Sequence, residues 1–161
     1  MQKSTRFWTR AAIIAALYVA LTFLAGTLGL ASGVIQLRLS EALTILPVFA
    51  PAAVPGLGIG CFLANLMTGC APWDVVFGTV ATVLGAVGTR ALRKKPFLAV
   101  LPPIVSNMVI VPIVLSRVYG VPDTIPYLML TVGIGEVLSC GVLGLLLHRA
   151  LKSHADKLFG R

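Results

Sequence analysis

Long apolar stretches with almost no charge are the feature that most constrains the fold of this chain. They occupy residues 7–31, 39–49, 56–68, 73–92, 97–118 and 125–147. A helix needs about 20 apolar residues to cross the roughly 30 Å hydrocarbon core of a bilayer. Open sheets cannot satisfy their backbone in lipid. The sequence therefore predicts an all-α integral membrane protein with six transmembrane helices, in a single domain covering residues 1–161.

Composition favours a bilayer over water as the surroundings. The chain is 58% hydrophobic and 11% charged, whereas soluble domains carry about 25% charged residues. The net charge of +8 does not indicate nucleic-acid binding, because the cations cluster between apolar stretches and no basic stripe alternates with aromatic residues. The first stretch exceeds the apolar core of about 7–15 residues in a signal peptide. We expect it to be retained as the first span.

The helices predicted at 39–49 and 56–68 are short. The chain between Leu39 and Gly69 contains three prolines and falls below the roughly 40 residues that two full spans and a turn require. Short helices among longer ones leave a concavity at one face of the membrane. Broken helices in membranes usually border such a cavity or a site.

Basic residues predict the orientation, because cytoplasmic segments are enriched in Lys and Arg. With both termini in the cytoplasm, only Arg38 and Arg117 fall outside the inner segments. The inner set comprises Lys3, Arg6, Arg10, Arg90, Arg93, Lys94, Lys95, Arg149, Lys152, Lys157 and Arg161. The expected location is the cell membrane, with several passes and cytoplasmic N- and C-termini. Candidate anchors at the membrane interface are Tyr18, Trp73, Tyr119 and Tyr127.

Six polar residues fall within the predicted spans or at their outer ends. They are Arg38, Glu41, Asn65, Asp74, Asn107 and Glu136. On the predicted topology all lie in the outer half or near the midplane. An ionisable group at the bilayer centre costs about 2.5–3.5 kcal/mol on insertion scales, so Glu136 needs a partner, a cavity or a proton. This bias toward the outer half is the central observation from the polar residues.

Each of these residues also has a structural interpretation. Glu136 could form a buried pair with Arg38. Asp74 follows "APW" and could cap the first turn of a helix. Asn65 and Asn107 could form hydrogen bonds between helices.

Arg38 and Glu41 are three residues apart, so both can lie on one face of a helix. On a surface such an ion pair contributes little to stability. If the pair faces a pocket, the guanidinium donors of Arg38 lie beside the two acceptor oxygens of Glu41. Carboxylates and amides together suit a small ligand rich in N–H groups, such as a purine-like edge. Trp73, Phe77 and Phe49 could supply a flat stacking surface, or else face lipid or the core.

Small residues recur along the helix predicted at 7–31. Ala12, Ala16 and Ala20 follow at a spacing of four, with Ala11 and Ala15 alongside. Such spacing lets helix backbones approach closely. This alanine stripe is a candidate docking surface for another membrane protein, or a packing face within the chain. A similar series at 56–68 comprises Gly56, Gly60 and Ala64.

The sequence lacks motifs for catalysis, metal binding or ATP hydrolysis. It has no HExxH motif and no P-loop, and His148 and His154 lie at the predicted cytoplasmic end. Cys61, Cys70 and Cys140 are widely spaced without a CxxC pair, which excludes a disulfide framework and favours apolar packing inside helices. We expect no enzyme, no metal and no cofactor in this chain, so any ATP must be used by another subunit.

Five motifs together resemble the QueT family, whose members are substrate-binding S components of energy-coupling factor (ECF) transporters. The motifs are IQLRLSEALTILPVF, GLGIGCFLANL, PWDVVFGTVATVL, SNMVIVPIVL and VGIGEVLS, in order across nearly the whole chain. The resemblance implies six membrane helices and an outward-facing pocket for a queuosine precursor. That precursor would be preQ0, preQ1 or queuine, all 7-deazaguanines. The implied partners are a transmembrane coupling protein, which docks on the alanine stripe, and two ATPases that use ATP.

A deazaguanine ligand implies a role for each polar residue. Glu41 or Glu136 would accept the ring N–H and the exocyclic amine, and Arg38 would donate to the carbonyl or orient Glu41. The two asparagines would hold the remaining polar edges, and Asp74 could meet the aminomethyl cation of preQ1. Two other functions stay open. One is an independent or proton-coupled carrier with Glu136 as the proton site, and the other is a membrane scaffold that transports nothing.

Overall fold

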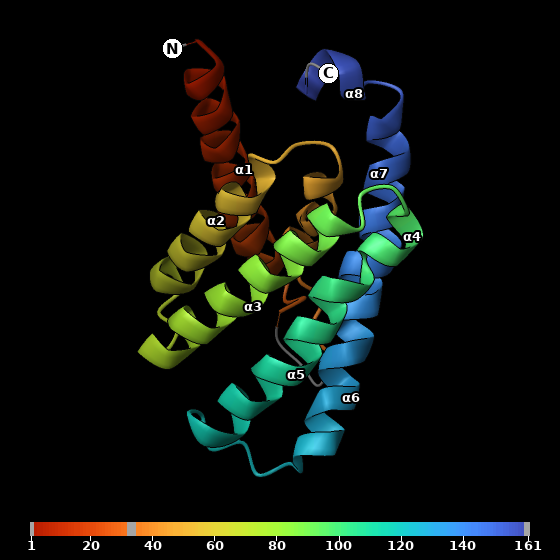
Figure 1. Ribbon diagram of the computed structural model, residues 1–161. Helices are drawn as coiled ribbons and strands as arrows, with labels where there is room; N and C mark the ends of the chain where they lie inside the picture. Colours follow the sequence, from red (N-terminus) through yellow and green to blue (C-terminus); the bar gives the residue numbers. More distant parts are fainter. Residues whose placement is uncertain (1, 32–34, 160–161) are drawn as a thin grey trace.

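The chain folds into a bundle of helices whose two termini lie at the same end of the molecule (Figure 1). The computed structural model describes residues 2–31 and 35–159. The elements are α1 (Gln2–Thr27), η1 (Leu39–Val48), α2 (Ala53–Met67), α3 (Pro72–Ala91), α4 (Pro96–Ala99), α5 (Leu101–Arg117), α6 (Ile125–Glu136), η2 (Val137–Leu143), α7 (Gly144–Lys152) and α8 (Ala155–Phe159). Within the described ranges no strand occurs, which confirms the all-α prediction.

Four helical stretches are long and apolar enough to cross a membrane. They are Ser4–Thr27, Pro72–Ala91, Pro96–Arg117 and Ile125–Lys152. The other two apolar helices are shorter, as predicted. With 15 residues, α2 extends about 22 Å, and the 10 residues of the 3₁₀ helix η1 extend about 20 Å. Several apolar helices of spanning length make this a multi-pass membrane protein.

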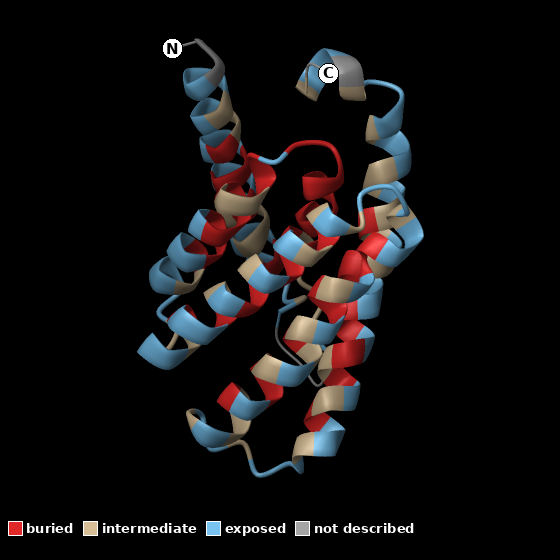
Figure 2. Cartoon of the chain, in the orientation of Figure 1, coloured by how far each residue is buried: buried red, intermediate tan, exposed pale blue. Residues whose placement is uncertain are grey.

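The outward faces of the long helices are apolar. Figure 2 shows exposed residues along the outer sides of α1, α2 and α3, with buried residues turned toward the interior. Large side chains such as Ile13, Leu84 and Phe97 are exposed there. Soluble monomers seldom expose apolar patches of this extent, so these faces suit contact with lipid.

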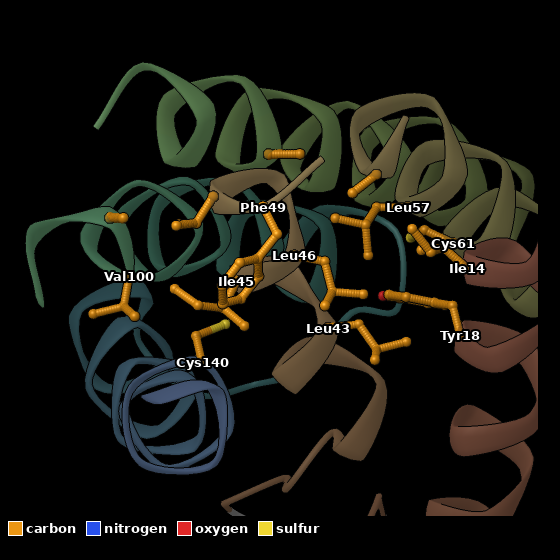
Figure 3. Packing of buried hydrophobic residues seen from close by; sticks show 14 of the residues in the cluster. Ile14, Tyr18, Leu43, Ile45, Leu46, Phe49, Leu57, Cys61, Val100 and Cys140 are labelled. Atoms are coloured by element: carbon orange, nitrogen blue, oxygen red, sulfur yellow. The ribbon is translucent and has the colours of Figure 1, made fainter. Parts of the chain in front are cut away.

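The short helix η1 forms the centre of the packing. It contacts α1, α3, η2 and α7, and nearly all of its residues are buried. Figure 3 shows Leu43, Ile45 and Leu46 of η1 between Tyr18 on one side and Cys140 on the other. The helix at 39–49 was predicted correctly in position. Its tight 3₁₀ form, which contains Pro47, was not predicted.

Helices α1 and α2 pack at very close range through glycines. A Cβ atom on Gly56 would lie 2.7 Å from the carbonyl oxygen of Ala11, and one on Gly60 would lie 3.0 Å from the Cα of Ala15. Both alanines are buried in this contact. The predicted alanine stripe therefore divides. Ala11 and Ala15 pack within the chain and leave no surface for a partner, whereas the exposed members are Ala12, Ala16 and Ala20.

Basic residues gather at the end that carries both termini. Arg10 donates to the carbonyl of Phe159 at 2.8 Å, and Arg90 donates to the carbonyl of Pro47 at 2.9 Å. Phe49 stacks on Phe159 with ring centroids 5.5 Å apart. This packing occupies Phe49, so it is no stacking surface for a ligand. Of the cations predicted to be cytoplasmic, Arg161 and the side chain of Lys3 lie outside what the structure describes.

Candidate functional site

Two adjoining cavities both have lining residues from the loop between α5 and α6, and Figure 1 shows this loop at the end of the molecule away from the termini. The α5–α6 cavity has a volume of about 460 Å³ and is lined by α5, α6 and the segment before η1. The α1–α3 cavity has a volume of about 510 Å³ and is lined by α1, α2, α3 and that same segment. The residues common to both are Gln36, Arg38, Leu115 and Val121. Both volumes fall within the roughly 300–1,000 Å³ of typical ligand pockets.

Arg38 lies where the two cavities meet. It is the extended residue that precedes η1, and its backbone N–H donates to Ser139 Oγ at 3.1 Å. A side chain at Gly135 would collide with the carbonyl oxygen of Gln36. This glycine of α6 therefore lets the segment before η1 lie directly against α6. The prediction that Arg38 and Glu41 share a helical face is corrected, because Arg38 stands outside the helix.

Glu41 and Glu136 form a pair of buried carboxylates beside Arg38. Carboxylate oxygens of the two residues and the Cys140 sulfur all lie within 4.8 Å of one another. Glu136 lines the α5–α6 cavity, whereas Glu41 is 1% exposed. Two ionised carboxylates at that separation repel by at least about 3.5 kcal/mol at an effective dielectric constant of about 20. A ligand that offers N–H donors or positive charge relieves this repulsion.

Three elements hold the carboxylate of Glu41 in place. The hydroxyl of Tyr18 on α1 donates to Oε1, and Asn107 Nδ2 on α5 donates to Oε2 at 3.5 Å. The hydroxyl of Thr44 donates to the backbone carbonyl of Glu41 at 2.6 Å. These contacts fix the orientation of Glu41, so the cavity wall is preorganised.

Cys140 connects the two carboxylates. Its thiol lies 3.1 Å from Glu136 Oε2 and 3.9 Å from Glu41 Oε2. It belongs to η2, a π-helical segment that begins directly after Glu136, and π-helical turns are frequent at functional sites. Glu41, Glu136 and Cys140 are also close enough to share a metal ion. Donors from Tyr18 and Asn107 already occupy the carboxylate of Glu41, which favours an organic ligand rich in N–H groups over a metal ion.

Asp74 and Asn65 line the α1–α3 cavity. The Tyr119 hydroxyl donates to Asp74 Oδ2 at 2.9 Å and accepts from the backbone N–H of Ala71 at 3.0 Å. Partial burial, with a smaller contribution from the Asp74 carboxylate, raises the pKa of Tyr119 to about 12, so the phenol remains a donor. No side-chain cap occurs at the start of α3. Asp74 lies in the first turn of α3, as predicted, but its side chain accepts from Tyr119 in the loop between α5 and α6 instead of capping the helix.

The structure brings most of the predicted ligand-binding residues to the cavities or directly behind them. These are Arg38, Glu41, Asn65, Asp74, Asn107 and Glu136. Trp73 and Phe77 are the exceptions. Their rings stack on each other with centroids 6.0 Å apart, they are 60% and 43% exposed, and neither lines a cavity. They face outward from α3, so they do not form the predicted stacking surface.

Three residues of the site were missed from the sequence. Tyr18, predicted as a membrane-interface anchor, is buried against Glu41. Its signal was the spacing from Ala15, which places both on the buried face of α1. Cys140, predicted as apolar packing, follows Glu136 by four residues and shares its face. Tyr119 lies in a loop, where no periodicity marks it. Cys70 also differs from prediction, because it lies outside the helices and lines the α1–α3 cavity.

Replacing Tyr18 by phenylalanine should lower the free energy of unfolding by about 1.5–3 kcal/mol, because it removes a buried donor to a carboxylate. A double-mutant cycle with Glu41→Gln should show coupling of at least about 1 kcal/mol. Denaturant or thermal unfolding of the wild type, the two single variants and the double variant measures this coupling energy. Tyr127→Phe is the matched control, since that ring is exposed. Additive effects of the Tyr18 and Glu41 variants would contradict the contact.

Two comparisons with known proteins indicate the same family. Residues 8–153 match the family model described as QueT transporter. A stretch of 74 residues is 36% identical to the queuosine precursor transporter QueT of Lactococcus lactis subsp. cremoris (strain MG1363). That alignment covers 45% of this chain and 43% of the relative, so it spans less than half the relative's length. No solved structure matches the chain.

Proposed function

The chain belongs to the QueT transporter family, and from that premise we propose that it is the substrate-binding S component of an ECF-type importer. It captures a queuosine precursor outside the cell, namely preQ0, preQ1 or queuine. A coupling protein and two ATPases, which are other chains, release the ligand into the cytoplasm at the expense of ATP. This chain needs no cofactor. The family is one of transporters, and the chain is not an enzyme.

The observation that carries this proposal is the buried carboxylate pair beside Arg38. A deazaguanine presents a ring N–H next to an exocyclic amine, and one carboxylate can accept from both. Glu136 lines the α5–α6 cavity and takes this role, with Glu41 behind it. Arg38 reaches the same cavity and donates to the ring carbonyl. Hydrogen bonds to ionised groups are about twice as strong as neutral ones, which suits high-affinity capture.

Charge distribution supports an outward-opening pocket. Arg10 and Arg90 form hydrogen bonds at the end that holds both termini. The loop between α5 and α6, which lines both cavities, lies at the other end (Figure 1). The positive-inside rule then assigns the termini to the cytoplasm and the cavities to the outside. Six crossings, two of them by the short helices η1 and α2, complete this topology.

The exposed part of the alanine stripe supports docking of a coupling protein. Ala12, Ala16 and Ala20 lie on the outer surface of α1, flanked by exposed Ile13 and Leu17. Small residues at a spacing of four permit close approach of a partner helix in lipid. Ala11 and Ala15 are buried against α2, so the proposed docking surface consists of Ala12, Ala16 and Ala20.

Uptake into proteoliposomes tests the transport mechanism. Vesicles that contain this chain, the coupling protein and both ATPases should accumulate labelled preQ1 only when ATP is supplied inside. Omission of the ATPases should reduce uptake to background, while binding of preQ1 to this chain persists. Uptake by the chain alone, driven by a proton gradient, would replace this proposal with the independent carrier.

A further inference from the structure

Acidic residues surround the two cavities although the chain as a whole is strongly basic. The net charge is +8, with only five acidic residues. Asp74, Asp123 and Glu136 line the cavities, and Glu41 lies directly behind. Arg38 is the single Lys or Arg among the described residues that lines either cavity. A recess lined mainly by one sign of charge concentrates ligands of the opposite sign, so the site favours a cation.

Asp74 lines the α1–α3 cavity, and within the described residues only one of its two carboxylate oxygens accepts a hydrogen bond. Tyr119 donates to Oδ2, and among the described residues no donor or cation is recorded at Oδ1. A Cβ atom on Gly78 would lie 3.7 Å from Asp74 Oδ1 and 3.0 Å from Asn65 Nδ2. The side chains of Asp74 and Asn65 thus converge beside Gly78, and both residues line the α1–α3 cavity.

Tyr119 fixes the position of that carboxylate. Its oxygen is held by the backbone N–H of Ala71 at 3.0 Å while its hydrogen points to Asp74. The next residue, Gly120, has φ +64, a left-handed conformation that glycine adopts without strain. The turn that glycine permits returns the loop to the cavity, where Val121 contributes to the wall of both cavities. Tyr119 is thus a positioning residue supplied by the loop between α5 and α6.

We propose that the α1–α3 cavity is an amine-binding subsite, in which Asp74, positioned by Tyr119, accepts an ammonium group of the ligand. The inference rests on the proposed function, in which Glu136 holds the deazaguanine ring in the α5–α6 cavity. Since the two cavities meet at Arg38, a substituent on the ring passes from one to the other. The consequence is selectivity for a 7-deazaguanine that carries a cationic amine over one with a neutral substituent.

Calorimetric titration with preQ1 and preQ0 tests the subsite, because the two share a ring and differ in the substituent. The substituent is an aminomethyl cation in preQ1 and a neutral nitrile in preQ0. Wild-type protein should bind preQ1 more tightly. Asp74→Asn should weaken preQ1 binding by about 10- to 100-fold and leave preQ0 binding unchanged. Tyr119→Phe should lower the preQ1-to-preQ0 affinity ratio by a smaller factor.

Binding of preQ0 by the same preparation shows that each variant is folded. Asp156→Asn removes a carboxylate from α8, at the far end of the chain, and should leave the ratio as in wild type. An unchanged ratio in Asp74→Asn, or an equal loss of both ligands, would overturn the subsite. Folded wild-type protein that binds neither ligand would overturn the proposed function itself, so the two failures are distinguishable.

Discussion

Replacing Glu136 by glutamine is expected to weaken binding of a 7-deazaguanine by at least about 100-fold. Glutamine keeps the shape of the side chain but exchanges one acceptor oxygen for an NH₂ donor. That donor then opposes the N–H groups of the ligand edge, and a buried donor left without a partner is costly. Isothermal titration of the purified protein measures the loss. Asp156→Asn, which neutralises a carboxylate of α8, is the control and should bind as wild type.

Glu41→Gln should lower ligand affinity and stability together. Tyr18 and Asn107 both donate to this carboxylate. In the glutamine variant, the side-chain NH₂ group would face one of these two donors, and that hydrogen bond would be lost. We expect its unfolding temperature to fall, whereas Glu136→Gln should mainly affect binding because Glu136 faces a cavity. Wild-type affinity in both variants would show that the carboxylate pair is structural and that the ligand binds elsewhere.

The second large effect is expected on coupled uptake. Leucine at Ala12 and Ala16 should abolish ATP-dependent accumulation of ligand and leave binding to the isolated chain unchanged. Both alanines are exposed, and two bulky side chains on that face would hold a partner helix away. Transport by the reconstituted complex and calorimetry of the isolated chain measure the two properties separately.

The neighbouring alanines provide the matched comparison. Ala11 and Ala15 are buried where α1 packs closely on Gly56 and Gly60 of α2. Leucine at either position should therefore destabilise the chain by about 1–3 kcal/mol through overpacking. Loss of folded protein, and not loss of coupling alone, is the expected result. Normal uptake by the Ala12→Leu, Ala16→Leu variant would rule out this face as the docking surface.

Helix positions could be predicted from the sequence because the thickness of the bilayer fixes how long an apolar stretch must be. Helices α3 and α6 each begin within one residue of the predicted start. Helix type could not be predicted in the same way. The 3₁₀ form of η1 and the π-helical turn η2 depend on packing against other elements, which hydropathy does not record.

The rotation of each helix was the main error, since a uniformly apolar helix gives no sign of which face is inside. This explains why Trp73 and Phe77 were assigned to the pocket but face outward. It also explains why one alanine stripe proved to be two faces. Charged residues were placed better, because a carboxylate in lipid must turn inward. Glu136 and Glu41 are accordingly both buried and lie close together.

The measurement that tests the central claim most directly is a titration of purified, folded protein with preQ0, preQ1, queuine and guanine, followed by tryptophan fluorescence and calorimetry. Saturable binding of at least one 7-deazaguanine at one site per chain, lost in Glu136→Gln, is the predicted result. Absence of saturable binding for all four compounds, in protein shown to be folded by its unfolding transition, would contradict a deazaguanine-binding S component.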